Sequence, residues 1–404
     1  MDLHSGLPFW IVKNELNDYY NPLLKDIEVD VAIIGSGITG TLVAHELCKA
    51  GIECAIFDKR TLSTGSTAAS TAQLQYEIDV PLVKLISKIG ETAAVNAYQC
   101  CLQSITDIEN VLKNSKSEVD FERVSSLYLA SSRKDLKLLE KEYECRVKNG
   151  IPVSFLNKSQ LKTFHNIESY GALKNLEAAQ MDSYRAAKNI MQFLQENNAL
   201  QIFSHTTITH WEKIKIGYEL KTEKDFKIKC KYVIIAAGFE AGKFLPKKLV
   251  HLNSTYVIIS QPVHKQDLWP ERSLIWETQE PYIYLRTTSD NRMMIGGGDI
   301  PYKDPVKRDQ LLREKINYLE KRFKSLFPHI AFEVDMAWCG TFSATQDGLP
   351  FIGNYQNKDK MLFALGYGGN GITFSMIAAQ ILTNKILGKY DSREELFGFN
   401  RKKK

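Results

Sequence analysis

The stretch that decides the predicted fold is Val29-Asp30-Val31-Ala32-Ile33-Ile34-Gly35-Ser36-Gly37-Ile38-Thr39-Gly40. A continuous apolar, β-branched run that ends at glycine is typical of a buried parallel strand. A helix is expected from Ile38 to Ala50, with Gly51 directly after its last residue. A second buried strand is expected from Ile52 to Phe57. The stretch therefore predicts a strand-helix-strand unit.

The three glycines of this unit indicate a dinucleotide site. One glycine forms the tight turn, one lets backbone amides approach a diphosphate, and the third lets the helix pack closely on the strand. Asp58 ends the second strand, where a carboxylate accepts hydrogen bonds from ribose hydroxyls. These features do not distinguish FAD from NAD.

A second glycine cluster, Gly366-Tyr367-Gly368-Gly369-Asn370-Gly371, favours FAD. It precedes an apolar helical run from Ile372 to Leu387, so that free amides and the positive end of the helix dipole lie at the glycines. Such a helix end stabilises the anionic reduced ring of a flavin. The alternative is a glycine-rich turn that only caps the helix.

Two further segments are expected to contact the ligand. Thr61 to Gln75 consists mostly of small residues and is either a solvated loop or a loop laid against the cofactor. A strand that ends in Ala236-Ala237-Gly238 resembles a second strand end on the cofactor side of the sheet. The residues expected to bind the cofactor are Gly35, Ser36, Gly37, Ile38, Thr39, Gly40, Asp58, Lys59, Ser66, Thr67, Ser70, Thr71, Gln73, Ile208, Ala237, Gly238, Gly340, Gly368, Gly369, Asn370, Gly371 and Ile372.

Composition narrows the class of protein. The chain has 404 residues, 44% hydrophobic and 25% charged, which is typical of a soluble globular protein with two domains. The net charge is +5, and Arg401 to Lys404 supply four of these charges, either as a solvated end or as a nucleic-acid or lipid contact. No membrane span or signal peptide is expected, and seven cysteines without disulfide or metal spacing indicate a cytoplasmic protein.

Five separated segments make the sequence similar to a known family. They are Gly35–Gly40, Gly65–Gln73, Arg286–Asp299, Thr345–Gly353 and Gly366–Gly371. In this order they resemble the D-amino-acid-oxidase/glycine-oxidase family of FAD-dependent amine oxidoreductases, most closely the branch that includes gamma-glutamylputrescine oxidase. The resemblance implies hydride removal from a carbon that bears an amine, giving an imine that water hydrolyses.

The fold class that follows is α/β (α+β overall), with a Rossmann-type FAD-binding domain interleaved with a mainly antiparallel-sheet substrate domain. The FAD-binding domain is expected over 1–90, 175–240 and 336–395, the substrate domain over 91–174 and 241–335, and a basic tail over 396–404. Helices are expected at 81–114, 132–148 and 182–197, a meander of strands at 213–235, and aromatic strands from 255 to 298.

Departures from the family pattern narrow the substrate. Where the resemblance implies arginines that bind a substrate carboxylate, this chain has Phe342 and Gly369, so a simple α-amino acid is disfavoured unless Arg286 replaces them. In the sarcosine-oxidase branch a cysteine tethers the flavin from about Gly340. Cys339 is one residue away, so non-covalent FAD is expected. That branch also has a lysine near Met294; its absence leaves oxygen, a quinone or a carrier protein open as electron acceptor.

The substrate-binding candidates are Arg286, Tyr282, Tyr284 and Trp276. Arg286 either grips an anionic part of the substrate or pairs with Asp290 or Asp299 as scaffold. The aromatic residues either hold an alkylammonium by cation–π attraction or pack within the sheet. No catalytic residue is assigned, and no metal or nucleic acid is expected. The rival hypotheses are a quinone- or carrier-linked dehydrogenase and a flavin-binding protein without turnover.

Overall fold

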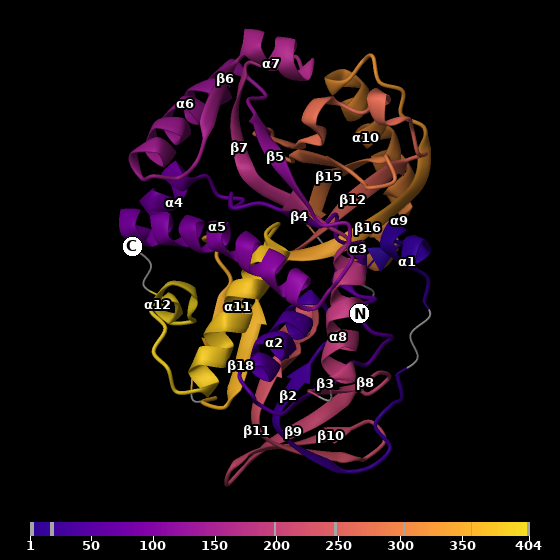
Figure 1. Ribbon diagram of the computed structural model, residues 1–404, viewed down its shortest axis with the longest axis vertical. Coiled ribbons are helices and arrows are strands. Elements are labelled where there is room, and N and C mark those ends of the chain that lie inside the picture. Colours follow the sequence, from indigo (N-terminus) through magenta and orange to yellow (C-terminus); the bar gives the residue numbers. More distant parts are fainter. Residues whose placement is uncertain are drawn as a thin grey trace.

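The computed structural model describes residues 4–16, 20–197, 199–245, 249–301, 304–356 and 358–401 (Figure 1). The α-helices are α1 (Phe9–Asn14), α2 (Ile38–Lys49), α3 (Ser66–Ala69), α4 (Leu82–Ile89), α5 (Glu91–Asn114), α6 (Arg133–Lys148), α7 (Lys158–His165), α8 (Ser183–Glu196), α9 (Pro305–Gln310), α10 (Leu312–Leu326), α11 (Gly371–Ile386) and α12 (Arg393–Phe397). Short 3₁₀ helices are η1 (Gly238–Phe244), η2 (Lys265–Asp267) and η3 (Pro270–Arg272). The strands are β1 (His4–Ser5), β2 (Ile27–Ile34), β3 (Cys54–Phe57), β4 (Gln73–Leu74), β5 (Glu122–Leu129), β6 (Ser154–Asn157), β7 (Gly171–Gln180), β8 (Leu200–Phe203), β9 (Ile208–Ile214), β10 (Gly217–Thr222), β11 (Lys227–Ile235), β12 (His251–Ser260), β13 (Leu274–Glu277), β14 (Ile283–Thr287), β15 (Met293–Pro301), β16 (Val334–Ala344), β17 (Phe351–Asn354) and β18 (Met361–Leu365).

One sheet is the predicted Rossmann-type sheet. Its order is β17-β18-β11-β2-β3-β8, and β18, β11, β2, β3 and β8 run parallel, whereas β17 runs antiparallel to β18. The β2-α2-β3 unit lies at its centre, as the sequence predicts. Strands β9 and β10 extend β11 as an antiparallel meander. The carboxyl ends of β2, β3, β11 and β18 therefore meet at one edge, where α/β sheets bind ligands.

The two faces of this sheet are covered differently. Helices α2, α8 and α11 pack on one face and share a large apolar core with α4 and α5. The other face packs against the β9–β10 meander and η1, around Phe57, Tyr218 and Phe363. Figure 1 shows α11 beside α2, although more than 300 residues separate them in the sequence.

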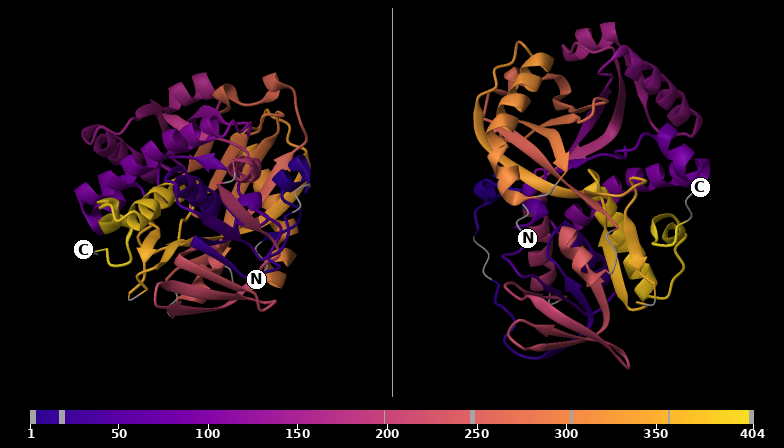
Figure 2. Two further views of the ribbon diagram at one scale, coloured as in Figure 1. Left: turned by 60° about the horizontal axis from the view of Figure 1, so that its bottom comes forward. Right: turned by 180° about the vertical axis from the view of Figure 1, so that it is seen from behind.

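The second sheet lies at the end of the molecule opposite to the Rossmann-type sheet (Figure 2). Its order is β1-β16-β12-β15-β14-β13-β5-β7-β4, with β6 also paired to β7, and all pairs are antiparallel except β13 with β5. Helix α10 packs on β12, β15 and β16 around Phe323 and Phe327. The predicted fold class, a parallel Rossmann-like sheet with a mainly antiparallel second sheet, is confirmed.

The domain boundaries stay a prediction, and two of them fall at strands of the second sheet. The proposed boundary at residue 175 lies inside β7, and β16 belongs to the second sheet although 336–395 is assigned to the FAD-binding domain. The sequence order of the segments does not show which sheet a strand joins, because these strands pair with segments that are far away in the sequence.

Two predicted segments differ locally from expectation. The helix expected over 81–114 is two helices, α4 and α5, separated by Gly90, whose φ of 94° interrupts the helical path. The segment expected as a loop before Gln73 contains the short helix α3, and Ala68 is fully buried there.

Within the described part of the predicted tail, Arg401 packs against the protein and is not solvated. The side chain of Arg401 is 5% exposed and forms two hydrogen bonds of 2.8 Å with the carboxylate of Asp347. Its guanidinium lies 3.9 Å from the ring centroid of Phe351. Burial alone would raise the pKa of Asp347, but Arg401 outweighs it and lowers that pKa. Residues 402–404 lie outside the described part of the chain.

Candidate functional site

A single cavity of about 550 Å³ joins the two glycine clusters. It lies between the carboxyl ends of the parallel strands and the inner face of the second sheet. Among the predicted residues, it is lined by Gly35, Gly37, Ile38, Thr39, Asp58, Lys59, Ser66, Thr67, Ser70, Thr71, Gln73, Ile208, Ala237, Gly238, Trp276, Tyr282, Tyr284, Gly340, Gly368, Gly369, Asn370, Gly371 and Ile372. Of the residues predicted to bind cofactor or substrate, Ser36, Gly40 and Arg286 lie outside this lining.

The first glycine cluster forms the tight strand-to-helix turn for steric reasons. Gly35 has a φ of 110°, which residues with a side chain rarely adopt, and a Cβ at Gly40 would lie 1.9 Å from the carbonyl oxygen of Gly35. Oδ2 of Asp58 accepts hydrogen bonds from the amide and the hydroxyl of Ser36, at 2.8 and 2.6 Å. Asp58 thus ties the turn to the end of β3, and its predicted contact with a ribose stays a prediction.

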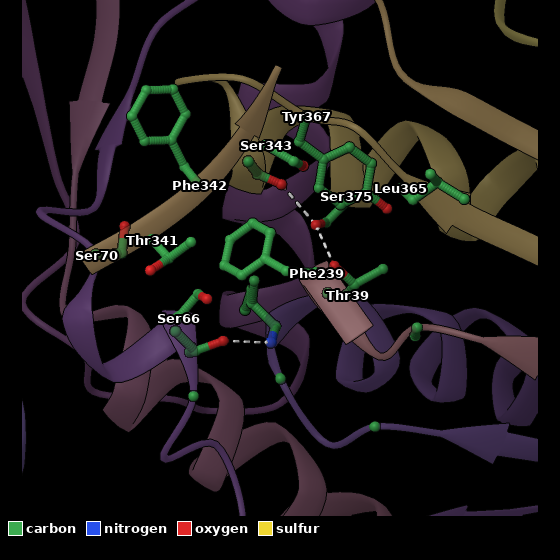
Figure 3. Close-up of a pocket in the computed structure, with 18 of the residues that line it drawn as sticks. Thr39, Ser66, Ser70, Phe239, Thr341, Phe342, Ser343, Leu365, Tyr367 and Ser375 are labelled. Carbon is green, nitrogen blue, oxygen red and sulfur yellow. Dashed lines mark hydrogen bonds between the residues drawn. The ribbon is translucent and has the colours of Figure 1, made fainter. Parts of the chain in front are cut away.

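The second glycine cluster brings the start of α11 to the same cavity. No side chain caps α11, so its first amides keep free donors at the positive end of the helix dipole. The hydroxyls of Thr39 on α2 and Ser375 on α11 lie 2.8 Å apart and join the two helix starts (Figure 3). Asn370 donates to the carbonyl oxygens of Gln75 and Glu77, which ties this turn to the segment after β4.

These residues fit a flavin dinucleotide. Buried polar atoms of Gln73 and Thr341 line the cavity without a partner among the described residues, as expected where a polar ligand supplies the missing hydrogen bonds. The amide of Ile38 donates to Thr67, which places α3 against the glycine turn. Figure 3 shows Ser66, Ser70 and Thr341 around the space between the turn and β16.

Positive charge in the lining is confined to one end. Among the described lining residues the cations are Lys59, Arg60 and Lys243, and all three pair with Glu240 on η1. Burial opposes ionisation of Glu240, but Lys59 and Arg60 outweigh it and hold its pKa below the usual range. Lys59 and Arg60 directly follow Asp58, so these cations lie at the end predicted for the dinucleotide's ribose and phosphates.

Aromatic side chains line the other end, and we call Trp276, Tyr282 and Tyr284 the aromatic wall. Trp276 stacks on Tyr128 with ring centroids 3.6 Å apart, and the rings of Tyr282 and Tyr284 lie 5.8 Å apart. Gly296 faces Tyr284 across the β14–β15 pair, and a Cβ there would lie 2.3 Å from the tyrosine ring. The glycine therefore lets this ring lie across the neighbouring strand.

Two carboxylates, Asp79 and Asp299, lie beside the aromatic wall, and we call them the acidic pair. Oδ2 of Asp79 accepts a 2.7 Å hydrogen bond from the amide of Gly369. Burial raises the pKa of Asp79, although hydrogen bonds from Gly369 and Tyr282 oppose the rise. Burial, together with the negative charge of Asp79, raises the pKa of Asp299 to about 7.

The charged groups that face Asp299 come from several elements. Besides Asp79, they are Glu280 before β14 and Lys315 on α10. The ammonium of Lys315 donates at 2.7 Å to the carbonyl oxygen of Gly298, and the structure contains no salt bridge between the acidic pair and a described lysine or arginine. The acidic pair therefore lies in the cavity without a salt bridge, and Lys315 is the cation whose charge opposes the rise in the pKa of Asp299.

Asp79 and Glu77 were missed as site residues, although the sequence carries a signal for them. From residue 73 to 79, Gln73, Gln75, Glu77 and Asp79 alternate with apolar residues, and all four line the cavity. The intervening Leu74, Tyr76 and Ile78 are buried in the core. Alternation with period two is the pattern of an extended segment with one polar face.

Arg286 lies outside the cavity lining and binds backbone carbonyl oxygens. Its guanidinium donates to the carbonyl oxygens of Thr71, Ala72, Met181 and Thr287, at 2.7 to 3.0 Å, and pairs with neither Asp290 nor Asp299. It lies 5.3 Å from the ring of Trp10, and burial lowers its pKa to about 10. Backbone carbonyls of separate segments converge here only through the tertiary fold, which no sequence pattern reveals.

Phe342 and Cys339 lie on β16. Phe342 lines the cavity, and Figure 3 shows its ring at the edge of the site. Cys339 is fully buried outside the lining, and its sulfur lies 2.8 Å from the hydroxyl of Ser5. Adjacent residues of a strand point to opposite faces, which accounts for the difference between Cys339 and its neighbour Gly340.

Comparison with known proteins agrees with this architecture. The family model described as DAO, FAD dependent oxidoreductase, matches residues 30–385. The chain belongs to this family. The DAO protein is 22% identical to gamma-glutamylputrescine oxidoreductase of Escherichia coli (strain K12), over 91% of this chain and 86% of the relative.

Solved structures show the same fold. A glycine oxidase from Geobacillus kaustophilus gives a TM-score of 0.76 at 21% identity, covering 93% of this DAO protein and 99% of that chain. An L-proline dehydrogenase from P. horikoshii gives 0.77 at 20% identity, covering 93% and 97%. Within the described residues, no helix is long and apolar enough to cross a bilayer, and no group of three or more metal-ligating side chains occurs.

Proposed function

We propose that this DAO protein oxidises an amine or amino-acid derivative by removing a hydride from the carbon that bears the nitrogen. The product is an imine, which water hydrolyses to a carbonyl compound and an amine or ammonia. Bound FAD supplies the hydride acceptor. The sequence resemblance to the gamma-glutamylputrescine oxidase branch supports an amine substrate.

The observation that carries this proposal is the single cavity that runs from the glycine turn to the aromatic wall. Its first part offers backbone amides beside Gly37 and polar side chains for a dinucleotide, and its second part offers rings that suit an organic substrate. A protein that only binds a nucleotide has no need of a second, aromatic compartment continuous with the first.

The residues of the chain would contribute by positioning and electrostatics. The free amides at the start of α11 favour negative charge that develops next to them. The aromatic wall would orient the reacting carbon and exclude water from it. Oxidation of a neutral amine needs no strong base, so the absence of an assigned catalytic dyad is consistent with this chemistry.

We further propose that the cofactor is held without a covalent bond and that the protein works in the cytoplasm. Cys339 lies outside the cavity lining, and the seven cysteines are free. Precipitation of the protein with acid should release all the flavin into the supernatant. A yellow pellet would contradict the non-covalent proposal.

The proposed function is tested by flavin absorbance. The purified protein should absorb near ~450 nm, and anaerobic addition of a suitable amine should bleach this band. Gly37→Leu should remove the absorbance, because even a Cβ there would lie 2.9 Å from Oγ1 of Thr67. Gly242→Leu is the matched control, since a Cβ at Gly242 has no neighbour within 4 Å. A yellow protein that no amine or amino acid bleaches would indicate flavin binding without turnover.

The electron acceptor is tested separately. Photo-reduced protein mixed with air should reoxidise within seconds if oxygen is the acceptor. Slow reoxidation that a soluble quinone accelerates would instead support the alternative, a dehydrogenase linked to a quinone or carrier protein.

A further inference from the structure

The two ends of the cavity differ in the charged side chains that line them. Its lysine and arginine side chains pair with Glu240 near Asp58, whereas the compartment of the aromatic wall contains the acidic pair Asp79 and Asp299. Asp79 is solvent-accessible although protein atoms surround it, as expected for a side chain that faces a cavity. A substrate carboxylate in this compartment would meet carboxylates and no lysine or arginine among the described lining residues.

Unpaired buried polar atoms of the lining residues independently indicate a ligand that forms hydrogen bonds in this compartment. One is a donor, Nε1 of Trp276, and two are carboxylate acceptors. No described residue donates to Oδ1 of Asp299 or to Oε2 of Glu77, and both atoms are buried. Glu77 is only 4% exposed, and its other oxygen already accepts from Arg146 and Asn175. Buried acceptors of this kind normally accept a hydrogen bond. We therefore expect a bound ligand to supply the missing donor to each of them.

The aromatic wall is consistent with the same kind of ligand. Tyrosine and tryptophan faces attract organic cations, and this attraction is strongest where water is excluded. Trp276 is 8% exposed and stacks on Tyr128, so its other face is the one available to the cavity. Rings and carboxylates together suit an alkylammonium, which has both an apolar body and a positive charge.

No lysine or arginine of this compartment is available to bind a substrate carboxylate among the residues that the structure describes. Arg286 donates to four backbone carbonyl oxygens and lies outside the lining. Phe342 and Gly369 line the cavity, and neither carries a charge. An unpaired substrate carboxylate would therefore lose its hydration without gaining a partner.

We propose that Asp79 and Asp299, with the aromatic wall, select a cationic alkylamine without a carboxylate, and that an α,ω-diamine is the class of substrate that fits. This inference rests on the proposed amine oxidation and specifies its substrate. The reacting nitrogen is bound as the neutral amine, whereas the second, distal ammonium interacts with the acidic pair.

Two probes of the same shape and opposite charge test the inference on the FAD-loaded protein. They are tert-butylammonium and pivalate (2,2-dimethylpropanoate), and the former cannot be oxidised because its carbon bearing nitrogen has no hydrogen. Binding is measured by calorimetry and by perturbation of the flavin spectrum at pH 8.5. We expect tert-butylammonium to bind at least about tenfold more tightly than pivalate. Equal or tighter binding of pivalate, or no binding of either probe, would overturn the inference.

Variants then assign the effect to residues. Asp79→Asn and Asp299→Asn should each weaken tert-butylammonium binding by about tenfold, with little change for pivalate. Asp267→Asn, an exposed acid on η2, is the matched control and should bind as the wild type does. Unchanged affinity in both site variants would contradict the role of the acidic pair. Should either variant fail to fold, the comparison of probes on the wild type still decides.

A substrate series separates this inference from the proposed function. Pentylamine, 1,4-diaminobutane and 4-aminobutanoate have similar lengths and carry a neutral, cationic or anionic distal group. The diamine should bleach the flavin at the lowest concentration. Fast bleaching by 4-aminobutanoate would refute the inference and leave amine oxidation intact. Binding of tert-butylammonium without bleaching by any amine would refute the proposed amine oxidation and leave the preference for a cation intact.

Discussion

Replacing Arg286 by methionine distinguishes a structural role from substrate binding. The guanidinium is 1% exposed and donates to carbonyl oxygens of three separate segments, around residues 71–72, 181 and 287. Arg286→Met keeps an apolar stem of similar length and removes all four hydrogen bonds. The carbonyl oxygen of Ala72 also accepts the amide of Met181, whereas the other carbonyl oxygens would lose the donor that Arg286 supplies.

The expected loss of stability follows from these contacts. Hydrogen bonds to a charged group contribute about 1.5–3 kcal/mol each. They are not additive, and removing a buried charge returns part of its desolvation cost, so we expect a net loss of about 3–5 kcal/mol. An unfolding entropy of roughly 2.1 cal/mol/K per residue over this chain length converts this loss to a fall in Tm of about 4–6 °C.

The assay is thermal unfolding of the FAD-loaded protein, combined with the concentration dependence of flavin bleaching. Arg313→Met on α10 is the control, because Arg313 is exposed, and its Tm should not change. A tenfold weaker substrate affinity with unchanged Tm would refute the structural role and restore Arg286 as a substrate-binding residue.

Three other changes have defined outcomes. Gly296→Val should displace the Tyr284 ring, since a Cβ already lies 2.3 Å from it, and should weaken tert-butylammonium binding by about tenfold while FAD content is kept. Arg401→Ala removes the partner of the buried Asp347 and should cost about 1–3 kcal/mol of unfolding free energy; an unchanged urea midpoint would contradict this. Because the pKa of Asp299 is raised to about 7, its carboxyl is neutral below that pH, and cation affinity should fall as the pH drops from 8 to 6. Titration of Asp299→Asn over the same range should show a weaker dependence, and an identical profile would contradict the assignment.

Local sequence predicted the part of the site that depends on backbone sterics. The turn at Gly35, the start of α2 and the glycine-led start of α11 are set by residues that neighbour each other in the chain. The same holds for α6 and α8, whose caps Ser132 and Asp182 accept hydrogen bonds from the first turn of each helix. Such features need no knowledge of which distant segments meet.

The parts that sequence could not supply are contacts between distant segments. Asp79 accepts a hydrogen bond from the amide of Gly369, which is 290 residues away. Glu240 forms salt bridges with Lys59 and Arg60, which follow β3. The sequence predicts that Arg286 binds an anionic group, whereas in the fold its guanidinium binds backbone carbonyl oxygens. In each case a polar group has several chemically reasonable partners, and packing of the two sheets decides among them.

The start of α11 explains how one cavity can suit both an anionic cofactor and the cationic substrate that we propose. Asp79 accepts the amide of Gly369, just before the helix, whereas no side chain caps the first amides of α11, from Gly371 to Thr373. Negative charge beside the helix start attracts a substrate ammonium, and the helix dipole behind it attracts negative charge on the cofactor. Removing the carboxylate should therefore weaken substrate binding and also strengthen the positive potential at the cofactor. Asp79→Asn is accordingly expected to raise the flavin reduction potential, a shift that a purely steric role of Asp79 would not produce.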